Sequence, residues 1–298
     1  MRLHAAAMLP VLALAFLPPM LNAQTSAITT DPAPDKAHPA AMETFQLPSH
    51  GALLNAFLYI AAGAGPHPTI ILLHGFPGNE RNLDLAQAMR RAGYNVLYFN
   101  YRGAWGSPGD FSFTHAIEDT QSAIAYLRVP ANAQRLRVDP QDLILIGHSM
   151  GGFMARYAGA QDPGIRAVAL ISAADMGVDT VDSLKPEQRK LALDPIARGL
   201  AAEGMAPLAG CTPQSLAAEV IANADAWNIP SLAPRLAARP VLVITSDDGL
   251  APSNDAFVAA LHKAGGTHVT ALHLATDHSY SDHRIALETS ILDWLATL

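Results

Sequence analysis

The chain has a single cysteine, Cys211, so no disulfide bond can form within it. It contains neither a C-x-x-C nor an H-E-x-x-H motif, and its twelve histidines are scattered, so the pattern gives no support to a zinc site. Basic runs are few and the net charge is −7, which argues against a nucleic-acid-binding protein. We therefore expect no metal, no cofactor and no nucleic-acid partner.

The N-terminus lacks an apolar run of the length that a membrane span requires, about 20 residues. A weakly positive start precedes an apolar run from Ala5 to Leu17, and Leu21-Asn22-Ala23 offers a small residue for cleavage. This pattern is typical of a secretory signal peptide over residues 1–23. Cleavage after Ala27 and a retained membrane anchor are the alternatives. We expect a secreted or periplasmic protein without stable membrane insertion after signal cleavage.

Apolar residues are abundant: half of the 298 residues are hydrophobic and 15% are charged, which is ample for one large core. Residues 24–42 are rich in Thr, Ala, Asp and Pro, and are predicted to be a flexible linker outside the fold. Over residues 43–298 apolar runs alternate with helical segments. This alternation predicts an α/β domain with a mostly parallel sheet and helices on both faces.

The first two expected strands form an antiparallel pair, and the later ones are separated by helices. The expected strands cover 42–47, 53–60, 69–73, 95–99, 142–146, 167–171, 241–245 and 269–274. The expected helices cover 83–92, 114–128, 150–160, 255–264 and 284–295. In such sheets, functional sites gather at the carboxyl ends of the strands.

A long segment, about residues 176–238, separates two of the expected strands. It is mostly helical in composition, is interrupted by six prolines, and is too long for a simple crossover. We interpret it as a helical lid insertion that lies over the strand ends and shapes a pocket. The alternative is one crossover helix with surface decoration.

The most informative motif follows the apolar run Leu143–Ile146. Gly147-His148-Ser149-Met150-Gly151 fits the G-x-S-x-G pattern, in which a strand, a sharp turn and a helix present a serine at the apex. The two glycines leave room where the strand and the helix nearly touch. Ser149 is therefore the candidate nucleophile.

A serine hydroxyl is a weak nucleophile and needs a base, which in turn needs an acid to orient it. The turn after strand 241–245 offers Asp248, with Asp247 as the alternative. The loop after the last strand offers His278, with His283 as the alternative. We favour Asp248 as the acid because it sits four residues before Pro252, in a turn that can aim its carboxylate across the strand ends. We favour His278 as the base because it lies in the loop itself, whereas His283 lies at the start of the final helix, where its side chain is less free to reach the serine.

Acyl transfer also requires donors for the developing oxyanion. The backbone N–H of Met150, the residue after the nucleophile, is one candidate, and the N–H of Phe76 in the loop after strand 69–73 is the other. Residues that could line an apolar acyl pocket are the aromatics Trp105, Phe111, Phe113 and Trp227, with Met205 of the lid. Burial in the core is the alternative for the aromatics.

Together these pieces resemble an α/β-hydrolase fold serine hydrolase, of the esterase, dienelactone-hydrolase-like or peptidase-S9-like branches. The matching stretches are His74–Gly78, Asn100–Gly103, Gly147–Gly152, Asp248–Pro252 and Asp277-His278. The resemblance covers residues 43–298, and the chain order of serine, acid and histidine is the one this fold uses.

Three functions are compatible with this resemblance. The first is hydrolysis of a small-molecule carboxylic ester through an acyl-enzyme, and the second is cleavage of an amide or peptide by the same residues. The third is a non-catalytic binding protein on a hydrolase scaffold. The ester is favoured over the peptide because no extra charged group that could hold a substrate terminus is identifiable. The complete Ser, Asp and His set argues against the third. The sequence does not indicate an oligomeric state.

Overall fold

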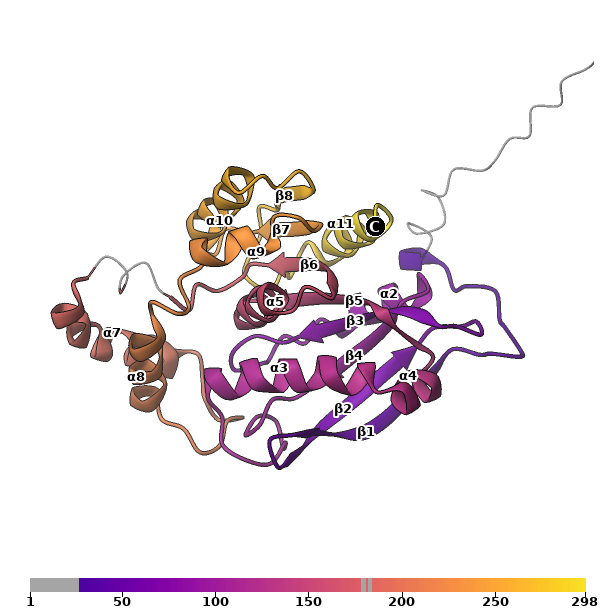
Figure 1. The fold of residues 1–298 in the computed structure, drawn as a ribbon, viewed down its shortest axis with the longest axis horizontal. Helices are drawn as coiled ribbons and strands as arrows, with labels where there is room; N and C mark the ends of the chain where they lie inside the picture. The colour runs from indigo at the N-terminus through magenta and orange to yellow at the C-terminus, as the bar shows by residue number, and fades with distance from the viewer. Residues whose placement is uncertain (1–26, 178–180, 182–183) are drawn as a thin grey trace, which may run out of the picture.

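An eight-stranded sheet is the centre of the structure, a computed structural model that describes residues 27–177, 181 and 184–298 (Figure 1). The strand order is β1-β2-β4-β3-β5-β6-β7-β8. β1 pairs antiparallel with β2, and β2 with β4, whereas all later neighbours are parallel. The strands are β1 (Ala41–Ser49), β2 (Ala52–Ile60), β3 (His67–Leu73), β4 (Asn95–Phe99), β5 (Val138–His148), β6 (Ile165–Ile171), β7 (Val241–Thr245) and β8 (Val269–His273).

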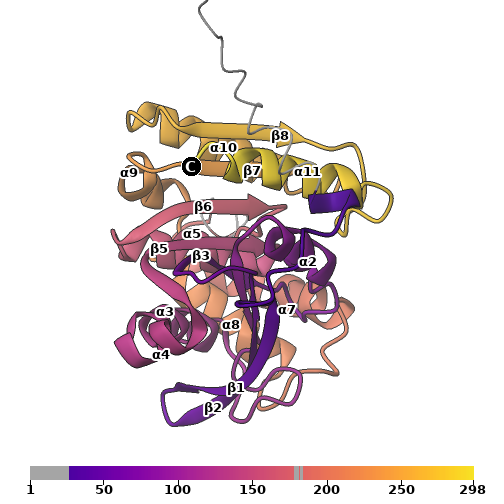
Figure 2. The same cartoon turned by 90° about the vertical axis from the view of Figure 1, so that its right-hand side faces the viewer.

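Helices cover both faces of this sheet, and each face has its own apolar core. Alternate residues of a strand point to opposite faces, so Ile71 of β3 contributes to one core and Ile70 to the other. One face packs against α3 (Phe113–Arg128), α5 (Met150–Gln161) and α10 (Ala251–Lys263). The other packs against α2 (Leu83–Arg91) and α11 (Arg284–Leu295). Figure 2 shows α3 and α2 on opposite sides of the sheet.

The predicted fold class is confirmed, and most element boundaries differ from the predicted ones by only a few residues. β5 begins at Val138, four residues before the expected start, and α10 begins at Ala251 rather than at residue 255. A short helix, α4 (Pro130–Leu136), was not predicted. The continuous apolar runs of β4 and β7 are fully buried, as expected for strands that are covered on both faces.

The segment before β1 departs from its prediction. Residues 27–42 do not lie outside the fold: the Ala27 side chain is buried in the core beside α2 and α11, and Ala41 already begins β1. The Gly63 N–H also donates a hydrogen bond of 2.9 Å to the His38 carbonyl. The local composition suggested a linker, but these contacts attach the segment to the domain. The predicted signal peptide lies outside the described residues.

The insertion between β6 and β7 is helical. It contains η1 (Pro186–Ala192), α7 (Leu193–Ala202), α8 (Pro213–Asn223), η2 (Pro230–Leu232) and α9 (Ala233–Leu236). α7 and α8 pack side by side at one end of the molecule (Figure 1). The Glu219 carboxylate of α8 accepts hydrogen bonds of 3.0 and 2.7 Å from the N–H groups of Phe113 and Thr114, at the start of α3. A carboxylate is favourable there because of the helix dipole, so it attaches the insertion to the domain.

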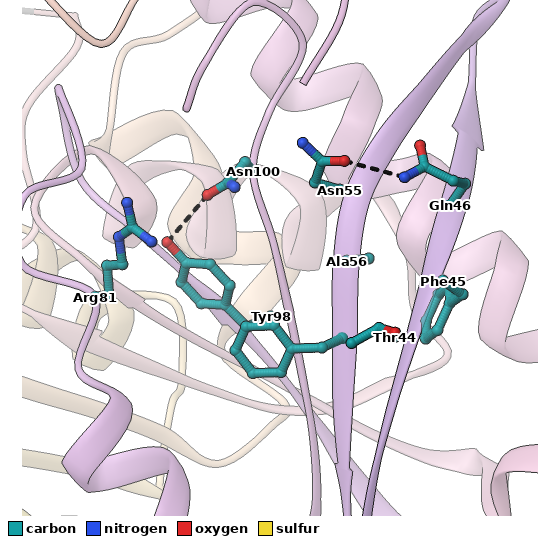
Figure 3. Close-up of a pocket in the computed structure, with 9 residues that line it drawn as sticks. Thr44, Phe45, Gln46, Asn55, Ala56, Arg81, Tyr98 and Asn100 are labelled. Atoms are coloured by element: carbon teal, nitrogen blue, oxygen red, sulfur yellow. Dashed lines mark hydrogen bonds between the residues drawn. The ribbon is translucent and has the colours of Figure 1, made fainter. Parts of the chain in front are cut away.

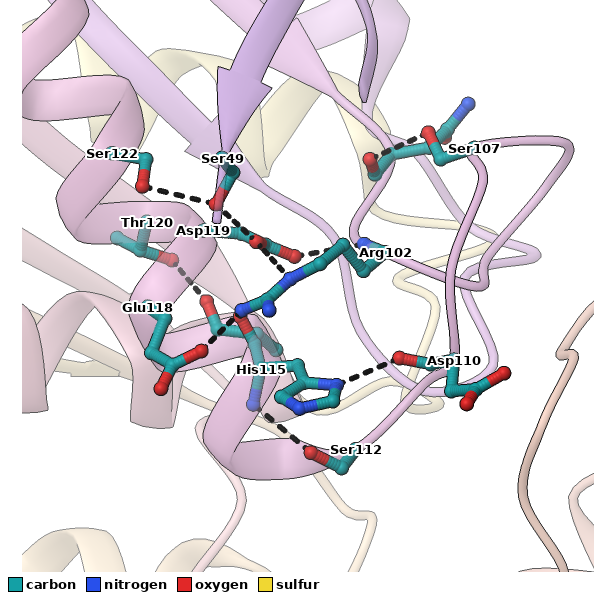
Figure 4. A network of polar contacts seen from close by, with 12 residues as sticks. Ser49, Arg102, Ser107, Asp110, Ser112, His115, Glu118, Asp119, Thr120 and Ser122 are labelled. Carbon is teal, nitrogen blue, oxygen red and sulfur yellow. Dashed lines mark hydrogen bonds and ion pairs between the residues drawn. The ribbon is translucent and has the colours of Figure 1, made fainter. Parts of the chain in front are cut away.

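A buried polar network fixes the loop that follows β4 (Figure 4). The Asp119 carboxylate on α3 accepts hydrogen bonds from Ser49 Oγ at 2.6 Å, from Arg102 Nε at 2.7 Å and from the Arg102 backbone N–H at 2.8 Å. Arg102 also contacts Glu118. The network anchors the loop that leads to Phe113, which forms part of the wall of the candidate site.

Among the described residues, no helix is long and apolar enough to cross a bilayer.

Candidate active site

Ser149, Asp248 and His278 line one cavity of about 410 Å³ at the carboxyl edge of the sheet. They follow β5, β7 and β8, whose ends meet at this edge because the strands are parallel. The cavity wall is mostly apolar, and its other lining residues are Phe76, Phe113, Met150, Ala174, Met176, Leu200, Glu203 and Leu250. The structure therefore brings together the three residues that the sequence selected as nucleophile, acid and base.

Ser149 occupies a sharp turn between β5 and α5, with φ 57° and ψ −123°. A positive φ is costly for a residue other than glycine, and the surrounding backbone holds it in place. A Cβ on Gly151 would lie 2.0 Å from the Leu73 carbonyl oxygen, and a Cβ on Gly147 would lie 2.0 Å from the Gly151 carbonyl oxygen. Glycine at both positions allows this approach, as the motif predicted.

We expect Gly151→Ala to lower the free energy of unfolding by about 3 kcal/mol or more, because a Cβ would collide with the β3 backbone. Gly199→Ala is the matched control. A Cβ at this α7 position meets nothing within 4 Å, so the change should raise stability by up to about 1 kcal/mol. Urea unfolding followed by circular dichroism measures both. Equal stability of the two variants would contradict the close approach at the elbow.

Asp248 and His278 form a hydrogen-bonded pair, with 2.7 Å between Oδ2 and Nδ1. The other carboxylate oxygen, Oδ1, accepts a hydrogen bond of 2.9 Å from the Leu250 N–H. Burial by itself would raise the pKa of Asp248, but the hydrogen bonds from His278 and Leu250 outweigh it and hold the pKa well below its usual range. Because the ionised carboxylate only accepts, His278 Nδ1 carries the proton and Nε2 remains free to accept another.

The two alternatives, Asp247 and His283, point elsewhere. Asp247 Oδ1 lies 3.1 Å from His273 Nε2 at an exposed position. His283 precedes α11, and its Nδ1 lies 2.8 Å from Asp282 Oδ1. Neither side chain contacts the Asp248–His278 pair or lines the cavity that the described residues form.

A buried hydroxyl cluster behind Asp248 was not found from the sequence. Ser172 Oγ lies 2.9 Å from Ser246 Oγ and 2.8 Å from the Tyr280 hydroxyl. Ser172 and Ser246 also lower the pKa of Asp248, while burial raises the pKa of Tyr280 to about 12, so its proton stays on at neutral pH. Ser172 directly follows β6 and Ser246 directly follows β7. Their place at strand ends was the one signal available in the sequence.

The two candidate oxyanion donors lie beside the nucleophile. Met150 is the first residue of α5, and a Cβ on Gly75, which precedes Phe76, would lie 2.9 Å from Ser149 Cβ. Among the described residues, neither the Phe76 nor the Met150 N–H donates a hydrogen bond to another protein group. Both residues line the cavity.

The structure separates the predicted pocket aromatics: Phe113 lines the cavity, as expected, whereas Trp105, Phe111 and Trp227 are not among its described lining residues, which corrects that part of the expectation. Phe111 is buried against Phe76, and Trp227 packs edge-on against Phe113. Trp105 Nε1 donates a hydrogen bond of 2.8 Å to the Pro77 carbonyl, and its ring is covered by the Arg81 guanidinium. Phe76 forms the wall together with Phe113. Phe111 and Trp227 therefore support the wall from behind, whereas Trp105 contacts the loop at Pro77.

A second hollow, of about 540 Å³, lies on the outer face of β1, β2 and β4 (Figure 3). Its polar side chains satisfy one another: Gln46 Nε2 donates to Asn55 Oδ1 at 3.0 Å, and the Tyr98 hydroxyl donates to Asn100 Oδ1 at 3.3 Å. Its lining holds no nucleophile paired with a base. Among the described residues, no group of three or more His, Cys, Asp or Glu side chains could hold a metal ion.

Two buried histidines flank the site. Burial lowers the pKa of both His74 and His148 to about 4. The ordinary histidine pKa is about 6.5, so the unfolded chain binds more protons than the folded chain between about pH 4 and pH 6.5. Their contribution to stability is therefore complete above about pH 6.5 and is lost as the pH falls towards 4.

We expect the free energy of unfolding to fall with decreasing pH in this window, by about 1.4 kcal/mol per pH unit for each buried histidine. Urea unfolding between pH 5 and pH 7 measures the slope. His148→Leu should reduce the slope by the share of one histidine. The lowered pKa of Asp248 does not contribute here, because the stability it confers is lost only below the unfolded carboxyl pKa of about 4. A slope unchanged by His148→Leu would contradict the prediction.

The strand order and the turn that holds Ser149 place the chain in a known fold family. The chain matches the model of the alpha/beta hydrolase fold family over residues 68–252 and belongs to that family. A similar curated protein is YfhR of Escherichia coli O157:H7, 37% identical over 121 residues, which cover 38% of this chain and 41% of that protein. The chain thus spans less than half the length of the first curated relatives it matches.

Solved structures share the fold at low sequence identity. A thermostable carboxyl esterase from Bacillus coagulans has a TM-score of 0.64 at 16% identity, and the match covers 86% of this chain and 98% of that one. Est1E from Butyrivibrio proteoclasticus, solved with ferulic acid, has a TM-score of 0.60 at 20% identity, covering 85% of this chain and 97% of that one. At these identities the similarity establishes the architecture.

Proposed function

We propose that this hydrolase cleaves carboxylic esters through an acyl-enzyme formed on Ser149. The single observation that carries the proposal is the Asp248–His278 hydrogen bond of 2.7 Å, which opens on the same cavity as a serine in a strained turn. A carboxylate, an imidazole and a serine in this arrangement have the components that nucleophilic catalysis requires.

In the first half of the proposed reaction, Ser149 Oγ attacks the ester carbonyl carbon and His278 Nε2 takes the hydroxyl proton. The carbonyl oxygen becomes an oxyanion, and the N–H groups of Phe76 and Met150 are placed to donate to it. His278 then returns the proton to the leaving alkoxide, the alcohol departs and the acyl group stays on Ser149. Asp248 keeps the proton on His278 Nδ1 and stabilises the imidazolium.

The second half repeats these steps with water. His278 Nε2 takes a proton from water as the water oxygen attacks the acyl carbon, and then protonates Ser149 Oγ as the acid leaves. Among the described residues, no hydrogen bond joins Ser149 Oγ to His278. Such contacts are often long before substrate binds, so we expect this one to tighten in the substrate complex.

The wall of the cavity favours a neutral, apolar acyl group. Beyond Asp248 and His278, the only ionisable side chain in the described lining is Glu203, and no Lys or Arg lines it. A substrate carboxylate would find no cation there, whereas methylenes could pack against Phe76, Met176 and Leu200. The lack of a cation also disfavours recognition of a peptide C-terminus, which supports an ester over a peptide.

We expect p-nitrophenyl esters of neutral acyl chains to be hydrolysed faster than aminoacyl p-nitroanilides. Methyl hexanoate should also exceed the singly charged monomethyl adipate in kcat/KM, by about tenfold, which corresponds to about 1.4 kcal/mol of repulsion and desolvation. Absorbance and proton release measure the two series. Faster turnover of the anilides would replace the ester with an amide, and faster turnover of monomethyl adipate would contradict the proposed charge preference.

We also propose that the protein is exported, because residues 1–23 have the pattern of a signal peptide. Expression of the chain with and without these residues, followed by cell fractionation and mass measurement, tests this. We expect export, and a mass that matches cleavage after Ala23, only when residues 1–23 are present. Equal retention of both forms in the cytoplasm would contradict the proposal.

A further inference from the structure

His148 precedes the candidate nucleophile, and its side chain lies outside the cavity lining. It is the last residue of β5, its side chain is buried, and the neighbouring strand β6 pairs with it through Ile171. His148 Nε2 lies 2.8 Å from the backbone carbonyl oxygen of His278. Because a carbonyl oxygen only accepts, Nε2 must carry the proton, and His148 is a donor with a fixed tautomer.

This hydrogen bond holds the main chain of the base at its carbonyl group. Among the described residues, His148 makes the only hydrogen bond to the His278 backbone, while Asp248 holds the ring. The His148 and His278 rings also pack together, with centroids 4.7 Å apart. The base is therefore fixed at two points, its imidazole by the acid and its main chain by the residue next to the nucleophile.

The choice of histidine at this position has a cost. His148 Nδ1 is buried without a hydrogen-bond partner among the described residues, and burial of an unpaired polar atom is unfavourable. An apolar side chain would avoid this cost but could not donate to the His278 carbonyl. The groups that surround His148 are the rings of His278 and Tyr280, and the charges of Arg284 and Asp248 act on it. Burial keeps His148 neutral, so it places no positive charge beside His278 when that ring is protonated in the proposed reaction.

We propose that His148 is a positioning residue that sets the separation of base and nucleophile, by donating its Nε2–H to the carbonyl of His278. The inference rests on the proposed function, in which His278 acts on Ser149. Since His148 and Ser149 are consecutive, any movement of the elbow carries the base with it. The main chain of the base is thereby linked to the residue next to the nucleophile, in addition to its attachment to the loop after β8.

The test compares three variants in ester hydrolysis and in the rate of Ser149 labelling by a fluorophosphonate. His148→Leu removes the donor and replaces it with an apolar side chain of comparable size. His148→Gln places an amide N–H at a position from which it can reach the same carbonyl. His262→Leu is the matched control. His262 lies on α10, away from the site, and its Nδ1 is 3.2 Å from the carbonyl oxygen of Gly266.

We expect His148→Leu to lower kcat and the labelling rate about 100-fold, the order of loss that a displacement of about 1 Å produces, with KM within twofold of wild type. His148→Gln should recover at least tenfold of this loss, and His262→Leu should stay within twofold of wild type. Circular dichroism confirms that each variant is folded.

Two results would overturn the inference: wild-type kcat in His148→Leu, or a His148→Gln variant as slow as His148→Leu. A merely structural role would not produce rescue by the amide donor with KM unchanged. A wild-type protein that neither hydrolyses esters nor reacts with the fluorophosphonate would instead overturn the proposed function itself, so the two failures are distinguishable.

Discussion

Ser149→Ala is expected to lower kcat for a p-nitrophenyl ester on the order of 10⁶-fold, the loss seen when the nucleophile of another serine hydrolase is removed. The physical reason is that, in the proposed mechanism, the cavity then keeps its oxyanion donors and its base but has no atom that can form the acyl-enzyme. KM should change little, because alanine leaves the apolar wall intact. Initial rates on purified wild type and variant measure the loss.

The matched control for this change is Ser290→Ala. Ser290 lies on α11, and its hydroxyl donates only to the Ala286 carbonyl of the same helix, at 2.8 Å. The control should keep wild-type rates. Residual activity of Ser149→Ala within about tenfold of wild type would mean that the reaction does not pass through this serine.

His278→Ala should cost almost as much as loss of the serine, on the order of 10⁴- to 10⁶-fold in kcat. Without the imidazole, Ser149 must lose its proton to water, and the leaving alkoxide finds no acid. The matched control, His283→Ala, removes an imidazole five residues away that contacts Asp282 rather than Asp248. Rates should stay within tenfold of wild type, since no atom of His283 faces the cavity.

The same pair of variants decides between the two candidate bases. Assays at several pH values between 6 and 9 separate loss of the base from a change in its protonation. Added imidazole offers a second readout, because a small base can enter the space that His278→Ala leaves. If His283→Ala is slower than His278→Ala, the base is His283.

The sequence predicted the fold well because the relevant signals are local and strong. β4 and β7 are short, mostly apolar runs between helices, and such runs are typical of buried strands. The elbow was predicted because G-x-S-x-G places glycines where two backbones meet, and the structure shows the contact between Gly147 and Gly151. The chain order of Ser149, Asp248 and His278 then indicated which acid and which histidine to select.

What the sequence missed depends on contacts between distant residues. The Ser172–Ser246–Tyr280 cluster joins three separate loops, and none of the three residues stands out alone. Composition placed Ala27 in a linker, but burial of its side chain depends on α2 and α11. Local patterns cannot show which strand ends or helices will be neighbours.

The pocket aromatics show a related limit. An aromatic side chain near a site can either line the cavity or support its wall, and sequence position does not distinguish the two. Phe111 and Trp227 take the supporting role because Phe76 and Phe113 are placed between them and the cavity. The identity of the wall follows from the path of the loop after β4, which the Arg102–Asp119 contacts fix.

The most direct test of the central claim is covalent labelling with a fluorophosphonate, read by intact-protein and peptide mass spectrometry. The account predicts one adduct per chain on the peptide that contains Ser149, none in Ser149→Ala, and much slower labelling in His278→Ala. An unlabelled wild-type protein, or an adduct that persists in Ser149→Ala, would contradict the account and favour a non-catalytic role for this scaffold.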